Sequence, residues 1–297
     1  MRVMFVLIVL MLSSFAVSQT IGSQTPPPKL LEGNIFYSSG NLRIKAFTVR
    51  PNVTGKLPAI ILNHGGTDGI GDSLRARARE LARAGFAVFA SAYRGEDGSD
   101  GKIEIAAGGV DDVLNGLTWW GRQKFVDPTR IGMLGSSHGA LIGLLSAARS
   151  LKIRALVFAY GVSDIYAWYR YLVASKQLGQ DALTKTTYGS GPADKPENFL
   201  LRYGLRVVPQ LPAAMPVLIL QGAKDVTVPL EQGQLLAAEL QKYGKPHSLE
   251  VYPNSAHGFL TARETVLKKY GAKSAQYAES VRAWNSAVTF LKQNLEH

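Results

Sequence analysis

The sequence predicts an α/β fold in which a mostly parallel central sheet is flanked by helices. Three observations support this prediction. First, short apolar runs alternate with longer amphipathic ones. Second, most of the apolar runs are continuous, as expected for strands covered on both faces of a sheet. Third, most amphipathic runs lie between two apolar ones, where the helices that connect parallel strands are expected. With 46% apolar residues in a chain of 297, the core alone is expected to stabilise this fold.

The elements follow from these runs in chain order, within one domain predicted over residues 34–294. A hairpin that turns at residues 39–41 opens the sheet, and the first helix has Asp72 or Ser73 as its N-cap and Gly85 as its stop. The predicted strands are 34–37, 42–49, 58–63, 86–92, 130–134, 153–160, 216–221 and 248–252. The predicted helices are 72–84, 110–121, 138–149, 230–243 and 276–291.

The segment 162–212 interrupts this alternation, because it contains no clear strand. It begins with aromatic residues, continues with polar ones, and holds several glycines and prolines. Such an insertion between two strands predicts a partly helical cap over one edge of the sheet. Trp168 in this segment and Tyr93 in the body are candidate substrate-binding residues. Alternatively, the aromatic residues only pack the cap onto the body.

The first residues are typical of a secretory signal peptide. Arg2 supplies an early positive charge, the apolar run 3–12 is too short to span a bilayer, and small residues precede a cleavage point. We therefore predict a signal peptide over residues 1–18, a leader over 19–33, and a secreted or periplasmic protein without stable membrane insertion after cleavage. An uncleaved membrane anchor is the alternative.

Cysteine, histidine and charge exclude several kinds of site. Without cysteine the chain has no disulfide, zinc–cysteine site, iron–sulfur cluster or thiol nucleophile. Its five histidines never fall at the i, i+4 spacing of a zinc-binding helix. The formal charge of +11 is not accompanied by the aromatic-interleaved basic motif of a nucleic-acid binder. We therefore predict no metal, no cofactor and no nucleic-acid partner, but a small-molecule substrate.

The main functional signal is the pentapeptide Gly135-Ser136-Ser137-His138-Gly139, which lies between a predicted strand and a predicted helix. It matches G-x-S-x-G, in which a sharp strand-to-helix turn holds a serine in a strained conformation and requires nearly side-chain-free neighbours two positions away. Gly135 and Gly139 meet that requirement. Ser137, at the centre, is therefore the candidate nucleophile, with Ser136 as the weaker alternative.

A serine nucleophile requires a base, and the base requires an orienting carboxylate. In this pattern the acid and then the histidine follow the serine, each on a loop after a strand. Asp225 and His257 follow two consecutive predicted strands, which makes them neighbours in space. Asp164, after an earlier strand, is the alternative acid. Of the other histidines, His247 begins a predicted strand, His64 precedes the serine, His138 adjoins it and His297 ends the chain. His257 is therefore the candidate base.

The remaining requirement is a pair of donors for the oxyanion. His64-Gly65-Gly66-Thr67 follows a predicted strand, and its small residues let backbone N–H groups approach a substrate oxygen. The N–H of His138, together with that of Gly66 or Thr67, is expected to form the oxyanion hole. We expect the side chain of His64 to position this loop.

Taken together, these residues resemble the α/β-hydrolase superfamily, most closely the catalytic domain of prolyl-oligopeptidase-type serine hydrolases and the dienelactone-hydrolase-like esterases. The resemblance covers nearly the whole mature chain and implies the α/β-hydrolase fold, with Ser137 as nucleophile, Asp225 as acid and His257 as base. It rests, in chain order, on His64-Gly65-Gly66, Tyr93-Arg94-Gly95, residues 126–132, the pentapeptide, residues 221–225 with Val228-Pro229, and His257-Gly258-Phe259.

Two departures from the family bear on the substrate. Its oligopeptidases carry a large β-propeller before the hydrolase domain, whereas only residues 1–33 precede the first predicted strand, and Ala140 stands where many relatives have a second glycine. We therefore predict a carboxylic-ester hydrolase that works through an acyl-enzyme. Small-peptide or amide hydrolysis is the alternative, and a catalytically silent binding protein is a third. Because His257 must be neutral to accept a proton, activity should rise with pH from about 6 to 8.

Overall fold

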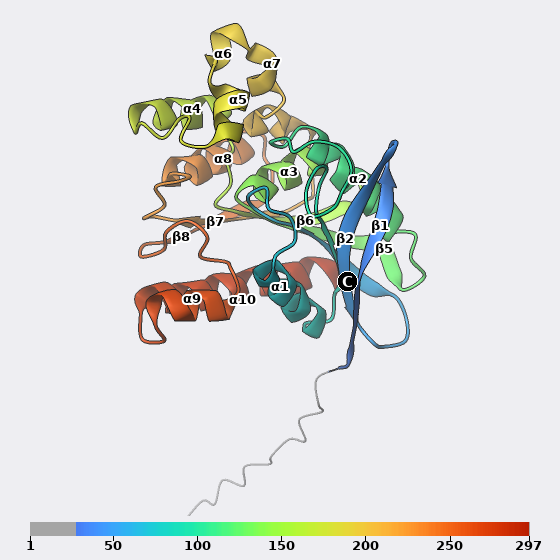
Figure 1. Cartoon of the computed structure of the whole chain (residues 1–297). Coiled ribbons are helices and arrows are strands. Elements are labelled where there is room, and N and C mark those ends of the chain that lie inside the picture. Colours follow the sequence, from blue (N-terminus) through green and yellow to red (C-terminus); the bar gives the residue numbers. More distant parts are fainter. Residues whose placement is uncertain (1–27, 297) are drawn as a thin grey trace, which may run out of the picture.

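The central sheet has eight strands in the order β1-β2-β4-β3-β5-β6-β7-β8 (Figure 1). β1 pairs with β2 and β2 with β4 in antiparallel fashion, whereas the other neighbouring pairs are parallel. The computed structural model describes residues 28–296. The predicted signal peptide and most of the predicted leader lie outside these residues and stay predictions. The mostly parallel α/β sheet is confirmed.

Strands and helices alternate along most of the chain. The strands are β1 (Leu30–Ser39), β2 (Leu42–Pro51), β3 (Leu57–Asn63), β4 (Ala87–Ser91), β5 (Val126–Ser136), β6 (Ile153–Ala159), β7 (Val217–Gly222) and β8 (His247–Tyr252). The helices are α1 (Asp72–Arg83), α2 (Gly108–Trp120), α3 (His138–Ala147), α4 (Ile165–Ala174), α5 (Ala182–Tyr188), α6 (Gly191–Asp194), α7 (Pro196–Leu200), the 3-10 helix η1 (Gly204–Gln210), α8 (Leu230–Lys242), α9 (Arg263–Tyr270) and α10 (Ala275–Leu295).

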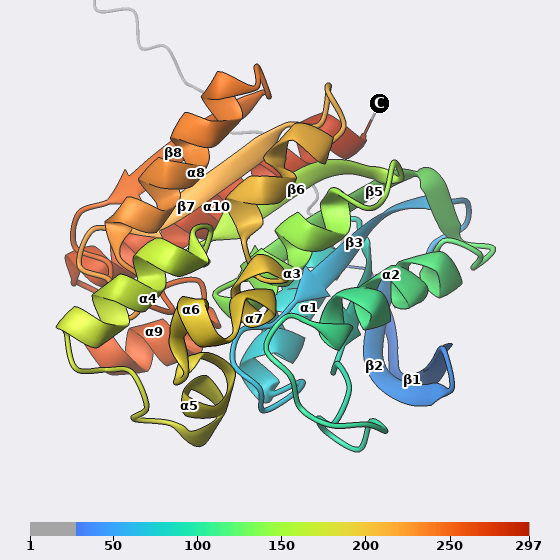
Figure 2. The same ribbon diagram turned by 90° about the horizontal axis from the view of Figure 1, so that it is seen from above.

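Helices cover both faces of the sheet (Figures 1 and 2). On one face, α2, α3 and α8 bury apolar side chains such as Leu117, Leu141 and Leu236 against the strands. On the other face, α1 and α10 do the same with Leu81 and Trp284. The central strands are therefore covered on both sides, which is why they read as continuous apolar runs in the sequence.

The carboxyl ends of the parallel strands form the edge that carries the candidate site. From β3 the chain passes to β4 on one side of the sheet and then to β5 on the other, so the strand order reverses between β3 and β5. Ligands of open α/β sheets bind at such a switch point. The residues 64–67 follow β3 and Ser137 follows β5, whereas Asp225 and His257 follow β7 and β8.

The insertion between β6 and β7 is helical and forms a cap over this edge (Figures 1 and 2). It contains α4 to α7 and η1. Tyr188 and Phe199 are almost completely buried in it, with their ring centroids 5.5 Å apart, and Val162, Ile165 and Val228 pack around them. The aromatic residues therefore give the cap a small core of its own, which is shared with the body.

The structure differs from the predicted ranges at several element ends, and three of the differences have a clear physical reason. β1 begins at Leu30, because all ten of its residues pair with β2 although polar residues interrupt its apolar pattern. α9 was not predicted, since Val266 is the only buried residue of this helix and no apolar face shows in the sequence. The predicted side-chain N-cap of α1 is wrong: Gly71 is the N-cap, and Asp72 lies in the first turn, where the helix dipole favours a negative charge. Within residues 28–296, no helix combines the length and apolar character needed to cross a membrane.

Candidate active site

The turn from β5 to α3 exposes Ser137 at the carboxyl edge of the sheet. Ser137 has φ 53° and ψ −121°, a strained conformation for a residue with a side chain. A Cβ atom on Gly139 would clash with the carbonyl oxygens of Asn63 and His64, and one on Gly135 would clash with Gly139. Both glycines are therefore required for the chain to turn this tightly beside β3.

The structure brings Ser137, His257 and Asp225 together in a hydrogen-bonded series, which we call the relay. Nε2 of His257 lies 2.9 Å from Oγ of Ser137, and Nδ1 lies 2.7 Å from Oδ2 of Asp225. The other carboxylate oxygen of Asp225 accepts the N–H groups of Thr227 and Val228 at 2.9 and 2.8 Å. Because an ionised carboxylate only accepts, Nδ1 carries the proton, and Nε2 accepts the hydroxyl proton of Ser137.

The two alternative residues have other partners. Asp164 is the N-cap of α4, and its carboxylate accepts two backbone N–H groups of this helix at 2.9 and 3.0 Å. Ser136 lines a cavity on the α1 side together with Tyr160, and burial raises the pKa of Tyr160 to about 12. The ring of Tyr160 contacts that of His257 edge to face, with centroids 5.0 Å apart. Tyr160 thus packs against the ring of His257, a contact that no sequence motif signalled.

Residues 64–67, which we call the HGG loop, lie beside Ser137. Gly66 has φ +69°, a left-handed conformation that favours glycine. Gly66, Thr67 and His138 line one cavity together with Ser137. Within the described part of the chain, the backbone N–H groups of these three residues donate to no protein group. The predicted oxyanion donors are therefore close to the serine and available to a substrate.

Behind the HGG loop, His64 and Tyr93 form a buried stack with centroids 4.2 Å apart. Nδ1 of His64 lies 3.1 Å from the carbonyl oxygen of Gly65, and the Tyr93 hydroxyl donates to the carbonyl of His64 at 3.2 Å. On its other side, Nε2 of His64 approaches Oε2 of Glu96 to 3.1 Å without forming a hydrogen bond, and burial raises the pKa of Glu96. His64 thus supports the loop. Tyr93, predicted to bind substrate, is buried by this stack and lines neither cavity beside Ser137.

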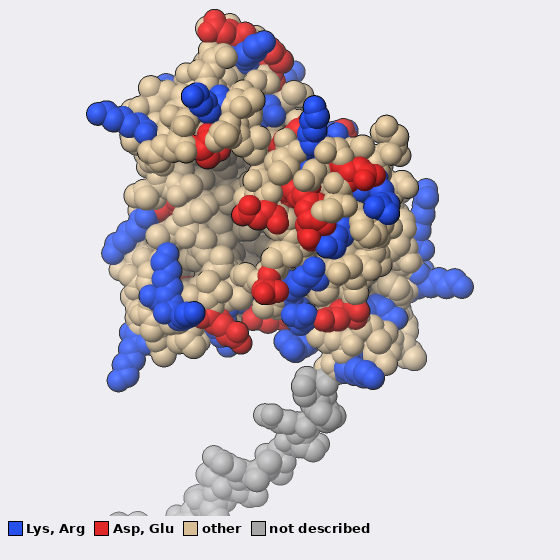
Figure 3. Space-filling view, in the orientation of Figure 1, with Lys and Arg blue, Asp and Glu red and all other residues tan. Residues whose placement is uncertain are grey.

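Two cavities meet at Ser137. The cap cavity, of about 230 Å³, lies under the cap and is lined mainly by apolar side chains, with Asp181 as its one carboxylate. The α1 cavity, of about 570 Å³, is lined by glycines and polar residues and includes His257. Only three residues line both cavities, and these are Gly66, Ser137 and Thr227. Figure 3 shows the hollow between cap and body, with acidic side chains along one side.

The cap is hydrogen-bonded to the loops around the relay. Trp168, predicted to bind substrate, lines the cap cavity, and its Nε1–H donates to the carbonyl of Thr227 at 2.9 Å. The Tyr171 hydroxyl donates to the carbonyl of Val226 at 2.6 Å. Arg202 is 5% exposed, and its Nε–H donates at 2.6 Å to a carbonyl of the turn before α2. Trp168 therefore joins the cap to the body, and its part in substrate binding stays a prediction.

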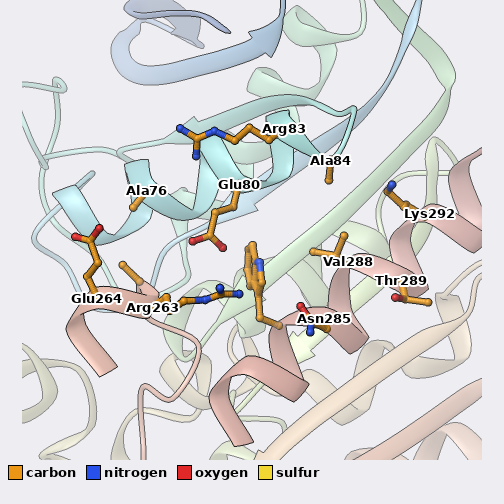
Figure 4. A pocket seen from close by; sticks show the side chains of 12 residues that line it. Ala76, Glu80, Arg83, Ala84, Arg263, Glu264, Asn285, Val288, Thr289 and Lys292 are labelled. Atoms are coloured by element: carbon orange, nitrogen blue, oxygen red, sulfur yellow. The ribbon is translucent and has the colours of Figure 1, made fainter. Parts of the chain in front are cut away.

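A third groove, of about 690 Å³, lies between α1, α9 and α10 (Figure 4). Side chains of both charge signs line it, including Glu80, Arg83 and Arg263, but its lining has neither a serine nor a histidine. It therefore lacks a nucleophile–base pair. Among the residues that the structure describes, no cluster of three or more His, Asp or Glu side chains is arranged to hold a metal ion.

Known proteins share this architecture. The chain matches the prolyl oligopeptidase family over residues 72–281. YtmA of Bacillus subtilis, an uncharacterized peptidase, is 28% identical over 226 residues, which are 76% of this chain and 85% of YtmA. A Bradyrhizobium protein described as a 2-oxo-3-(5-oxofuran-2-ylidene)propanoate lactonase is 27% identical over 269 residues, 87% of this chain and 92% of that protein.

Solved structures agree with these relatives. An acylaminoacyl peptidase of Pyrococcus horikoshii superposes with a TM-score of 0.73 at 19% identity, and the match covers 90% of this chain but only 42% of that one. A dienelactone hydrolase of Klebsiella pneumoniae superposes with a TM-score of 0.64 at 20% identity and is covered to 99%. Both likenesses show the α/β-hydrolase fold that the sequence predicted. Because the family match spans more than half of the chain, this protein belongs to the prolyl oligopeptidase family of serine hydrolases.

Proposed function

We propose that this chain hydrolyses carboxylic esters through an acyl-enzyme intermediate formed on Ser137. The observation that carries the proposal is the relay, in which the serine hydroxyl, the imidazole and a buried carboxylate follow one another at 2.9 and 2.7 Å. Its position between two cavities gives a substrate room on both sides of the scissile bond. The similarity to a protein described as a lactonase, over 87% of this chain and 92% of that protein, supports ester chemistry.

In the acylation half, Oγ of Ser137 attacks the ester carbonyl carbon while its proton passes to Nε2 of His257. The oxyanion that forms accepts the N–H of His138 and an N–H of the HGG loop. Asp225 stabilises the imidazolium and holds its ring in place. When the intermediate collapses, the carbon–oxygen bond to the alcohol breaks, and His257 returns its proton to the departing oxygen.

In the deacylation half, His257 takes a proton from water, whose oxygen attacks the acyl carbonyl carbon. A second oxyanion accepts the same N–H groups. The bond to Oγ then breaks, Ser137 regains its proton from His257, and the carboxylic acid leaves. Water is the only reactant that these steps require besides the ester.

The two cavities have different parts in this scheme. Since His257 must protonate the departing alcohol, the alcohol belongs in the α1 cavity, which His257 lines, and the acyl group belongs in the cap cavity. The cap cavity is the smaller of the two, at about 230 Å³ against 570 Å³, and therefore suits a short acyl group. In the α1 cavity, Arg77 is the one cationic lining residue, and it already donates to the carbonyls of Leu260 and Thr261 and to Glu80. A neutral alcohol group therefore fits this cavity better than an anionic one.

Ser137→Ala tests this proposal. The purified variant should lose about 10⁶-fold in kcat on short p-nitrophenyl esters and should no longer react with a fluorophosphonate probe. Ser136→Ala is the matched control, since it removes the neighbouring hydroxyl, and it should keep most of the activity. Hydrolysis by Ser137→Ala at the wild-type rate would refute the proposal.

Peptide or amide hydrolysis is the second candidate, because YtmA and the acylaminoacyl peptidase are named as peptidases. Both reactions use the same relay, so only the substrate separates them. An ester and an anilide with the same acyl group should be compared by kcat/KM in wild type. The ester proposal fails if the anilide is the better substrate after correction for the intrinsic reactivities of the two bonds.

A further inference from the structure

The side chain of His138 connects two segments of backbone that lie on either side of it. Nδ1 is 2.9 Å from the carbonyl oxygen of Gly66, and Nε2 is 2.7 Å from the backbone nitrogen of Ala106. These partners fix the tautomer. A backbone N–H can only donate, so Nε2 is the acceptor, and Nδ1 therefore carries the proton that is donated to Gly66.

The carbonyl held by His138 belongs to the peptide group that joins Gly66 to Thr67. This peptide is trans, as are all the others in residues 28–296, so its C=O and N–H point in opposite directions. Fixing the carbonyl of Gly66 therefore also fixes the direction of the Thr67 N–H. Gly66 has a positive φ and no side chain, so its own conformation leaves this peptide free to rotate without such a contact.

The other contact of the ring is a rigid turn. Ala106 has φ 54°, which is strained for alanine, and is only 1% exposed. Hydrogen bonds hold the turn on both sides: Ala107 N–H donates to the carbonyl of Ile105 at 2.7 Å, and Arg202 Nε–H donates to the same carbonyl at 2.6 Å. The buried Arg202 comes from the cap. His138 is thus supported by a turn that the cap itself helps to hold.

We propose that His138 is a positioning residue that acts through the carbonyl of Gly66 to aim the HGG loop at the oxyanion. The proposal rests on the function proposed above. One residue then has two parts: its backbone N–H is one oxyanion donor, and its ring holds the peptide that supplies the other. No substitution at this position removes the backbone donor, so the part played by the ring can be tested separately.

Two substitutions each keep one hydrogen bond of the His138 ring and remove the other. The side-chain nitrogen of asparagine occupies the place of Nδ1, so His138→Asn keeps a donor for Gly66 and loses the contact with Ala106. The amide oxygen of glutamine occupies the place of Nε2, so His138→Gln keeps an acceptor for Ala106 and leaves the carbonyl of Gly66 without a donor. Both variants are neutral and similar in size, which makes each the control for the other.

Kinetics on a short p-nitrophenyl ester should separate the variants. We expect His138→Gln to lose about 10- to 100-fold in kcat, with KM changed by less than about threefold, since an oxyanion donor acts mainly in the transition state. The affinity for a trifluoromethyl ketone, whose adduct with serine carries an oxyanion, should fall by the same factor. His138→Asn, which keeps a donor for Gly66, should lose at least about fivefold less than His138→Gln in both measurements.

Each other outcome counts against the proposal. Equal losses of kcat in the two variants, or wild-type kcat in His138→Gln, would show that the ring does not aim the loop. A rise in KM alone would indicate a change in the pocket. Ser137→Ala, measured in parallel, tests the proposed function separately, because it removes the nucleophile and leaves the ring of His138 in place.

The wild-type protein offers a test that needs no variant. In protein labelled with ¹⁵N-histidine, the ring that shows cross-relaxation with the amide proton of Ala106 should carry its proton on Nδ1 at pH 7. Burial lowers the pKa of His138 to about 4, so the same ring should still be neutral at pH 5.5. A proton on Nε2 at pH 7, or a doubly protonated ring at pH 5.5, would overturn the inference even if both variants failed to fold.

Discussion

The turn from β5 to α3 around Ser137, which we call the elbow, and the cap form two sides of the candidate site. They are held in place by different means. At the elbow the backbone itself is the constraint, because a Cβ atom on Gly135 or Gly139 would overlap neighbouring main chain. In the cap the constraint comes from side chains, such as Trp168 and Arg202, which donate to carbonyls of loops distant in sequence. The elbow therefore tolerates almost no substitution at its glycines, whereas the cap is held by several moderate interactions.

Because of this difference, substitutions in the two regions are expected to affect different properties, the rate of the reaction in one and the substrate selectivity in the other. The elbow and the HGG loop place the groups that would carry the chemistry, and their arrangement depends on close approach of backbone to backbone. The cap supplies about half of the residues that line the cap cavity and contacts the loop after Asp225 through Trp168 and Tyr171. Substitutions at the elbow should thus affect folding and kcat, and those in the cap should affect the choice of acyl group.

The largest effect is expected for Gly139→Ala. The added methyl group would clash with the carbonyls of Asn63 and His64, and neither carbonyl can move without displacing β3. We expect the free energy of unfolding to fall by about 3 to 5 kcal/mol, with loss of probe labelling at Ser137. Urea unfolding followed by circular dichroism measures this. Gly33→Ala, with open space around the added Cβ, is the control and should change stability by less than about 1 kcal/mol.

The pH dependence of stability is the next largest expected effect. Burial lowers the pKa of His138 to about 4, whereas an unfolded histidine titrates near its ordinary value of about 6.5. Between these values the unfolded chain binds a proton that the folded chain does not, so stability is lost as pH falls from about 6.5 to 4. The loss amounts to at most about 3 kcal/mol. Below pH 4 both states are protonated and this contribution levels off.

Urea titrations at several pH values would detect this contribution. His138→Asn removes the titrating ring, so its stability should depend less steeply on pH than that of wild type over this window. Identical slopes for the two proteins would contradict the predicted protonation behaviour of the His138 imidazole.

The smallest effect is expected in the cap. Trp168→Phe keeps an aromatic ring but removes the hydrogen bond to the carbonyl of Thr227, which should lower the free energy of unfolding by about 1 kcal/mol. Because Trp168 lines the cap cavity, KM for esters of different acyl length should shift while kcat changes little. Tyr166→Phe, on the same helix, is the control. An unchanged acyl-length profile in Trp168→Phe would mean that this wall does not select the acyl group.

Much of the fold and of the relay could be predicted from sequence, because the signals are local. Continuous apolar runs indicated the buried strands, and Gly135 and Gly139 indicated a turn that excludes side chains. Asp225 and His257 were found because each follows a strand whose carboxyl end meets the same edge of the sheet. The structure places these side chains within hydrogen-bonding distance. Their catalytic roles remain to be tested by substitution.

The residues that could not be predicted have partners far away in the chain. Arg202 looks like a surface charge in the sequence, and its burial depends on a carbonyl 97 residues earlier. Glu96 lies in an acidic loop in the sequence, yet the structure buries it with its Oε2 3.1 Å from Nε2 of His64. Tyr93 looked like a pocket wall, but its positive φ of 41° lets it stack behind the HGG loop. Such contacts depend on tertiary packing and leave no periodic pattern.

The meeting of the two cavities at Ser137 has a consequence for the fate of an acylated enzyme. An acyl chain under the cap would not obstruct the α1 cavity, since the two share only Gly66, Ser137 and Thr227. Once the first product has departed, that vacated chamber would admit water and small alcohols alike. The partition between hydrolysis and transesterification would then be governed by the wider chamber, and could be tuned there without altering which acyl donors are accepted.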